Sequence, residues 1–199
     1  IAMLAGDRPL QSVFFGGGTP SLMSGASVER MMQTVRKRFN CMDAMETTLE
    51  INPASMLYDT LSRYSESGIQ RLSIGGQSFH KDHLKTLGRI HDPESIHNTY
   101  FAAQKAGIER INIDIMYHLP GQNQEQALAD IDQVIQLRPE HISWYELTYE
   151  PNTVFAKTKP KRLDSDQAFD MAVSGKNRLS DSGYRRYEVS AYTRGQPCL

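Results

Sequence analysis

Apolar runs rich in β-branched and aromatic residues alternate along the chain with stretches whose apolar residues recur every three or four positions. The first kind of run predicts strands and the second predicts amphipathic helices. Strands are expected at 12–15, 47–52, 71–75, 110–117, 141–149 and 184–192. Helices are expected at 28–39, 55–67, 93–106, 124–137 and 165–182. Because strands and helices alternate, the pattern is typical of β/α units around a parallel sheet.

The helix expected at 124–137 shows the pattern most clearly, with one apolar stripe that should lie on the sheet, formed by Ala127, Leu128, Ile131, Val134 and Ile135. The other helices have plausible boundaries. Three glycines occupy the position just after an expected helix end, where glycine is common, namely Gly68, Gly107 and Gly183. Ser55 and Ser165 are expected to cap helix starts, and Pro93 fits a first turn.

The repeated strand and helix order predicts an α/β fold, and it favours an open or closed β/α barrel over a flat doubly wound sheet. One segment, 151–163, breaks the pattern and is expected to be an exposed loop with solvated charges on Lys157, Lys159, Lys161 and Arg162. Parallel β/α folds carry their chemistry at the carboxyl ends of the strands, so these ends are where a site is expected.

Length and charge narrow the class of protein. The chain has 199 residues, which suits one large domain or part of a larger protein. With 22 Lys and Arg against 23 Asp and Glu, its formal net charge is -1, so no electrostatic field favours binding to nucleic acid or to an anionic membrane. No apolar run reaches the ~20 residues that span a bilayer, and no signal-peptide pattern is present, so a cytoplasmic location is expected.

The triple glycine Gly16-Gly17-Gly18, followed by Thr19, comes directly behind the apolar run 13–15. Glycine lacks a Cβ and reaches positive φ, so a ligand can approach the bare backbone there. The alternative is a tight strand-to-helix turn, which a single glycine would satisfy. We therefore expect a ligand-binding loop at this strand end.

Polar residues also follow the next three strands. Glu50, Gln77 and Asp114 stand at or near the ends of the strands at 47–52, 71–75 and 110–117, and Arg89 follows Gly88. A carboxylate can accept two ribose hydroxyls, an amide donates and accepts, and a guanidinium can grip a carboxylate. This set suits a nucleoside that carries an amino-acid tail.

Each of these residues also has a simpler interpretation. Glu50 could face solvent, and Arg89 could be a solvated charge at a helix end. Asp114 stands in an apolar strand and needs a partner or a ligand. The histidines at 80, 83, 91 and 97 show no metal-ligand spacing and are expected at the surface or in a supporting layer.

The motifs resemble those of the radical S-adenosyl-L-methionine (SAM) family of oxygen-independent coproporphyrinogen III oxidases and their heme-chaperone branch. The matching segments occur in the family's order: FGGGTPS at 15–21, EINP at 50–53, RLSIGGQSF at 71–79, LGRIH at 87–91 and NIDIMY at 112–117. The segment HISWYELT at 141–148 is more similar to the chaperone branch. The resemblance runs from about residue 12 to the end of the chain.

The resemblance implies a partial (β/α) barrel that binds SAM, with Gly17, Gly18 and Thr19 at its methionyl amino end. It implies that Glu50 and Gln77 meet ribose hydroxyls, Arg89 the SAM carboxylate and Asp114 another polar edge. It also implies heme as ligand and heme-acceptor proteins as partners.

One part of the family pattern is absent. Family members hold a [4Fe-4S] cluster with three closely spaced cysteines, whereas this chain has only Cys41 and Cys198. The chain also begins with Ile1 and ends shortly after a strand-like segment. We therefore expect 1–199 to be a radical SAM core fragment without the first β/α unit, its cluster loop and the C-terminal region, so that the cluster ligands lie outside it.

The sequence also allows other functions to be considered for this chain. The same motifs suit an oxygen-independent coproporphyrinogen III oxidase, which carries out an oxidative decarboxylation in porphyrin biosynthesis. A nicotinamide-binding Rossmann fold fits poorly, because Ser21 replaces a third glycine and Glu50 lies well beyond the usual ~20-residue separation. A binding or scaffold module without catalysis also remains open for the fragment.

Overall fold

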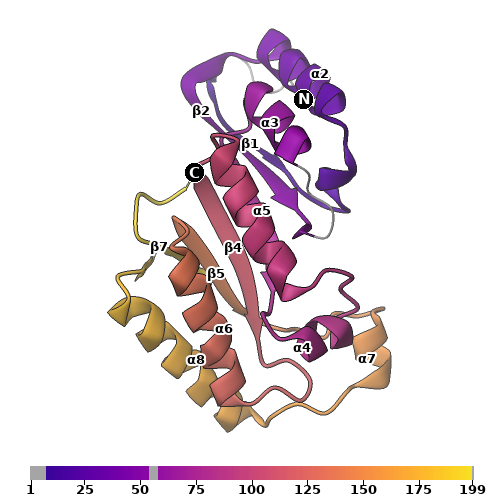
Figure 1. Ribbon diagram of the computed structural model, residues 1–199, viewed down its shortest axis with the longest axis vertical. Coiled ribbons are helices and arrows are strands. Elements are labelled where there is room, and N and C mark those ends of the chain that lie inside the picture. Colours follow the sequence, from indigo (N-terminus) through magenta and orange to yellow (C-terminus); the bar gives the residue numbers. More distant parts are fainter. Residues whose placement is uncertain (1–7, 54–57, 199) are drawn as a thin grey trace.

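The computed structural model describes residues 8–53 and 58–198, and in them a twisted sheet carries helices along its length (Figure 1). The strands are β1 (Leu10–Phe15), β2 (Cys41–Ile51), β3 (Arg71–Gln77), β4 (Arg110–Tyr117), β5 (His141–Glu146), β6 (Arg185–Arg186) and β7 (Ala191–Thr193). The helices are η1 (Pro20–Leu22), α2 (Gly25–Arg38), α3 (Tyr58–Glu66), α4 (Lys81–Thr86), α5 (Pro93–Lys105), α6 (Gln124–Leu137), α7 (Val154–Thr158) and α8 (Ser165–Asp181).

The sheet order is β1-β2-β3-β4-β5-β7-β6. Strands β1 to β5 are parallel neighbours in chain order, as crossover helices require. Strand β7 pairs antiparallel with β5, and β6 pairs antiparallel with β7. The predicted α/β class and partial barrel are confirmed, and all five parallel strands end at one edge of the sheet.

Side chains alternate between the two faces of each central strand. Leu72 and Ile74 on β3 are fully buried among the helices, together with Ile111, Ile113 and Ile115 on β4. The opposite face, which we call the inner face, carries Ser73, Asn112 and Ser143, joined by hydrogen bonds from Asn112 Nδ2 to both serine Oγ atoms at 2.9 Å. The helices thus pack on one face, and the polar face lines the barrel interior.

Several predicted helix boundaries are confirmed. Gly68, Gly107 and Gly183 have φ of 96°, 82° and 85° just after helix ends, and Pro93 opens α5 behind the N-cap Asp92. The prediction for Ser165 is wrong: Asp164 caps α8 through a capping box with Gln167, and Ser165 is the first helical residue. Ser55 lies outside the described residues.

A single strand was expected at 184–192, and this prediction is wrong. Tyr187 N–H donates to Ala191 C=O at 3.0 Å, so the segment folds back as two short antiparallel strands, β6 and β7. Alternation along a sequence shows that a strand forms but not its direction. Strand β2 also begins six residues earlier than expected, at Cys41, and helices α4 and α7 were not predicted.

The segment 151–163 is only partly the exposed loop that was expected. Helix α7 lies within it, and Lys157, Lys159 and Lys161 are exposed. Arg162 is half-buried: its Nη1 donates to Leu147 C=O at 2.5 Å and its guanidinium lies 4.0 Å from the centre of the Tyr149 ring. Arg162 is therefore a packing residue, since its long side chain covers apolar surface.

Helix α8 packs closely enough that one of its positions admits only glycine. A Cβ on Gly175 would lie 2.8 Å from three atoms of the Trp144 ring. Alanine is the better helix former, so Gly175→Ala tests whether packing outweighs propensity. We expect the variant to lower the free energy of unfolding by about 1 to 2 kcal/mol in urea denaturation.

The neighbouring exposed Lys176 provides the control, because Lys176→Ala touches no ring and should stay within about 0.5 kcal/mol of the wild type. A Gly175→Ala protein as stable as the wild type would show that α8 can shift away from Trp144.

Among residues 8–53 and 58–198, no helix has the length and apolar character needed to cross a membrane.

Candidate functional site

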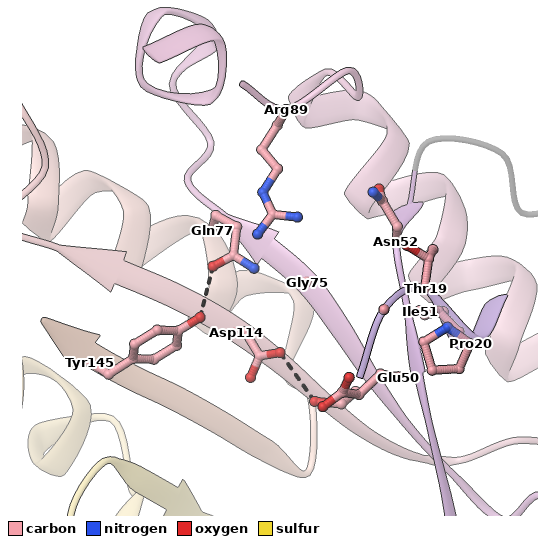
Figure 2. A pocket seen from close by; sticks show the side chains of 12 residues that line it. Thr19, Pro20, Glu50, Ile51, Asn52, Gly75, Gln77, Arg89, Asp114 and Tyr145 are labelled. Atoms are coloured by element: carbon pink, nitrogen blue, oxygen red, sulfur yellow. Dashed lines mark hydrogen bonds between the residues drawn. The ribbon is translucent and has the colours of Figure 1, made fainter. Parts of the chain in front are cut away.

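A cavity of about 250 Å³ opens at the carboxyl ends of β1 to β5. Its lining, shown in part in Figure 2, consists of Gly18, Thr19, Pro20, Glu50, Ile51, Asn52, Ser73, Gly75, Gln77, Arg89, Asp114 and Tyr145. Six of the seven residues expected from the sequence therefore lie around one cavity, and Gly17 contacts it through Glu50. The rule that parallel strands gather their chemistry at one edge explains this convergence.

The glycine loop has the geometry that its sequence predicts. Gly17 and Gly18 have φ of 79° and 62°, a conformation that L side chains rarely adopt. A Cβ on Gly16 would lie 2.7 Å from Phe14 Cε1 and 3.1 Å from Glu50 Oε1. All three glycines are thus needed, and a single-glycine turn does not account for the loop.

The loop is fixed from behind by a buried tyrosine. Tyr64 Oη donates to Met23 C=O at 2.6 Å and to Ser21 C=O at 3.2 Å. On the cavity side, Gly17 N–H donates to Glu50 Oε2 at 3.2 Å. Glu50 is therefore not a solvent-facing alternate of β2, because its carboxylate joins the loop to the strand end.

Gln77 ends β3 in an unusual conformation, with φ of 67°. The register with β4 shifts between Ile74 and Gln77, so the strand bulges just before the cavity. Tyr145 Oη donates to Gln77 Oε1 at 2.9 Å, and the Gln77 amide nitrogen faces the cavity (Figure 2). The side chain therefore offers a donor to a ligand.

The backbone after Gln77 is held by a buried carboxylate from α6. Asp130 is 0% exposed and accepts hydrogen bonds from Ser78 Oγ at 2.8 Å and from Phe79 N–H at 2.6 Å. Burial raises the pKa of Asp130 from 3.8 to about 6, although these hydrogen bonds and the nearby His80 favour the charged form. Asp130 thus anchors the turn that presents Gln77.

Arg89 reaches the cavity because of how α4 ends. Arg89 N–H donates to Leu84 C=O at 2.9 Å and Gly88 N–H donates to Lys85 C=O at 3.0 Å, which is a Schellman motif with Gly88 at φ 69°. The exposed guanidinium points toward Gln77 (Figure 2). It is the positive charge among the cavity's side chains, opposite the carboxylates of Glu50 and Asp114.

Asp114 has partners within the chain. Asn112 Nδ2 donates to one carboxylate oxygen at 2.8 Å and Ser73 Oγ donates to the other at 3.2 Å. Burial raises the pKa of Asp114, and the nearby Glu50 charge acts in the same direction, while the hydrogen bonds oppose them. This carboxylate lines the cavity as a preorganised acceptor.

Two of the four histidines lie in a supporting layer, one of the two locations expected from the sequence. His83 and His91 are 5% exposed, and burial lowers the pKa of each ring. His91 Nε2 lies 3.2 Å from Gly76 C=O, against the bulge of β3. Both rings belong to the core under the site.

Sequence reasoning missed three polar residues of the lining: Asn52, Ser73 and Tyr145. Tyr145 could have been found, because it follows Ser143 by two positions and so shares the inner face of β5. It was missed because only strand ends were considered.

Among the described residues, no group of three His, Cys, Asp or Glu side chains could hold a metal ion. Cys41, at the start of β2, and Cys198 are both free and half-buried. A [4Fe-4S] cluster needs three or four thiolates, so the cysteines of this chain do not fit it.

The family model described as the Radical SAM superfamily matches residues 1–134. The chain belongs to the radical SAM superfamily. It is 43% identical to "Heme chaperone HemW" of Haemophilus influenzae over 94% of this chain and 49% of that protein. It is 41% identical to "Heme chaperone HemW" of Escherichia coli over 96% of this chain and 51% of that protein.

The chain thus spans about half the length of the curated relatives it matches. Among solved structures, it is similar to coproporphyrinogen III oxidase (HemN) from Escherichia coli, with a TM-score of 0.87 and 28% identity. That match covers 97% of this chain and 45% of the oxidase. The family predicted from the motifs and the partial radical SAM barrel are both confirmed.

Radical SAM proteins use SAM, and the donor set of the cavity fits it. SAM carries an ammonium, a sulfonium, a carboxylate and a ribose diol. The cavity offers two carboxylates, one guanidinium, two side-chain amides and backbone groups that glycine leaves accessible. The cavity therefore carries charges complementary to both the positive and the negative groups of SAM.

Proposed function

We propose that the intact protein containing this chain is a heme chaperone that binds SAM in the 250 Å³ cavity and passes heme to acceptor proteins. The observation that carries this proposal is the identity of 41% to 43% with two proteins named as heme chaperones, over 94% to 96% of this chain. We place the protein in the cytoplasm as part of the same proposal.

The positions of the lining residues suggest which group of SAM each of them would bind. Gly17, Gly18 and Thr19 would receive the methionyl ammonium, since acceptors on bare backbone suit a cation. Glu50 and Gln77 would bind the ribose hydroxyls.

At the same methionyl end, Arg89 would bind the SAM carboxylate, which shares its α-carbon with the ammonium, and Asp114 would bind another polar edge of the ligand. When bound, SAM supplies an adenosyl group activated by its sulfonium, while the residues of this chain orient it. We propose that cysteines outside this chain hold the [4Fe-4S] cluster.

The test uses the full-length protein that contains this chain. We expect saturable SAM binding in calorimetry, stable heme binding in an absorbance titration, transfer of that heme to an apo-acceptor, and no conversion of coproporphyrinogen III. A protein that binds SAM but not heme would contradict the chaperone assignment while leaving the family intact.

A second candidate function is an oxygen-independent coproporphyrinogen III oxidase. The structural match to the Escherichia coli oxidase, with a TM-score of 0.87, favours it. Efficient oxidative decarboxylation of coproporphyrinogen III by the reduced, SAM-loaded full-length protein would decide for the oxidase against the chaperone.

A further inference from the structure

The sequence motif at 71–79 begins with Arg71, which has no role in the SAM cavity. This residue opens β3 and lies on the same strand face as Ser73, so its side chain is on the inner face of the sheet. Arg71 is 6% exposed, and its Nε has no hydrogen-bond partner among residues 8–53 and 58–198. A buried guanidinium whose Nε donor is unsatisfied is costly, which points to a missing acceptor such as an anionic group.

Two carboxylates of this region, those of Glu46 and Glu140, pair with a different arginine. Arg110 stands beside Arg71 in the strand register. It binds Glu46 at 2.6 Å and Glu140 at 3.0 Å, so both acids neutralise Arg110. His141 adds no negative charge, and its pKa is lowered to about 4 by burial and then by the charge of Arg71.

Arg71 faces a second cavity, of about 510 Å³. Its lining includes the acids Glu50, Asp114 and Glu188 together with Ser73 and Tyr145. Four of these residues also line the SAM cavity, namely Glu50, Ser73, Asp114 and Tyr145. A ligand in the second cavity would therefore lie against the SAM site, with Arg71 at the amino end of β3.

We propose that Arg71 binds a carboxylate group of a ligand in this second cavity. The planar guanidinium fork matches a carboxylate, and a single buried cation balances a single negative charge. A dianion such as phosphate would be repelled by Glu50, Asp114 and Glu188, which line the same space. The carboxylate could belong to a small organic acid or to the acid arm of a larger molecule such as a tetrapyrrole.

The test measures thermal unfolding of the full-length protein in sodium propionate, with sodium chloride of equal ionic strength and neutral propionamide as controls. We expect propionate alone to raise Tm, by about 3 °C at a tenfold excess over its Kd. Arg71→Gln should abolish this shift. Arg38→Gln, at an exposed arginine that ends α2, should retain it.

An equal propionate shift in wild type and Arg71→Gln, or none in the wild type, would overturn the proposal. If Arg71→Gln does not fold, Arg71→Lys replaces it. That variant keeps the charge without the fork, so a reduced shift supports the proposal and an undiminished shift overturns it.

A second experiment distinguishes the two sources of the carboxylate. Of the two experiments, only this one rests on the proposed function. It compares the affinity of wild type and Arg71→Gln for heme and for heme dimethyl ester. A roughly tenfold loss for heme but not for the ester would assign the carboxylate to a tetrapyrrole arm. Equal affinities would assign it to a small acid.

Discussion

Arg89→Ala is expected to weaken SAM binding by about 10- to 100-fold and to leave stability nearly unchanged. A charge-assisted hydrogen bond to a carboxylate is worth about 1.5 to 3 kcal/mol, which gives this range of affinity. The guanidinium is exposed and no ion pair ties it to another residue in the described part of the chain, so the fold does not depend on it. Calorimetry with the full-length protein measures the loss.

Two variants sharpen this test. Arg89→Lys keeps the positive charge but loses the planar fork, so its affinity should fall between those of wild type and Arg89→Ala. Lys85→Ala removes an exposed charge from the last turn of α4 and should leave affinity unchanged. If both alanine variants weaken binding equally, Arg89 contributes only long-range electrostatic attraction and does not bind the carboxylate directly.

The strand ends of the site could be predicted because their geometry is local. The order of apolar runs and glycines places Gly17, Glu50 and Asp114 at the same edge of a parallel sheet, whatever the details of the helices. Positive φ at Gly17 and Gly18 follows from the residue type itself. These features depend on short stretches of sequence and on one topological rule.

The supporting contacts could not be predicted because they join distant segments. Asp130 accepts a hydrogen bond from Ser78, 52 residues earlier, and nothing near either residue in the sequence indicates the pair. The only signal was positional: Asp130 falls on the helix face formed by Ala127, Ile131 and Val134, where an apolar residue is expected. Likewise, alternation could not show that the segment after Gly183 turns back as a hairpin.

The Asp130 contact leads to a prediction about pH. The folded protein holds the proton of Asp130 more tightly than the unfolded chain does, because burial raises its pKa from 3.8 to about 6. The stability that the protonated carboxyl contributes is therefore complete below about pH 4 and is lost as the pH rises through about 6. The shift corresponds to a loss of about 3 kcal/mol by pH 7.

Asp130→Asn cannot ionise, and its amide has nearly the same shape. Its oxygen can still accept the Phe79 N–H, so the turn after Gln77 is retained. We expect the free energy of unfolding of the variant, relative to wild type, to rise by about 2 to 3 kcal/mol between pH 4 and pH 7. Urea denaturation at several pH values gives this difference directly, and the other carboxyl groups cancel in it.

Glu125→Gln, at an exposed position in the first turn of the same helix, is the control and should change by about 1 kcal/mol or less over this range. A pH-independent difference between Asp130→Asn and wild type would show that Asp130 keeps an ordinary pKa. The two hydrogen bonds from Ser78 and Phe79 would then balance the cost of burying the charge, and an ionised Asp130 would hold the turn that presents Gln77 at neutral pH.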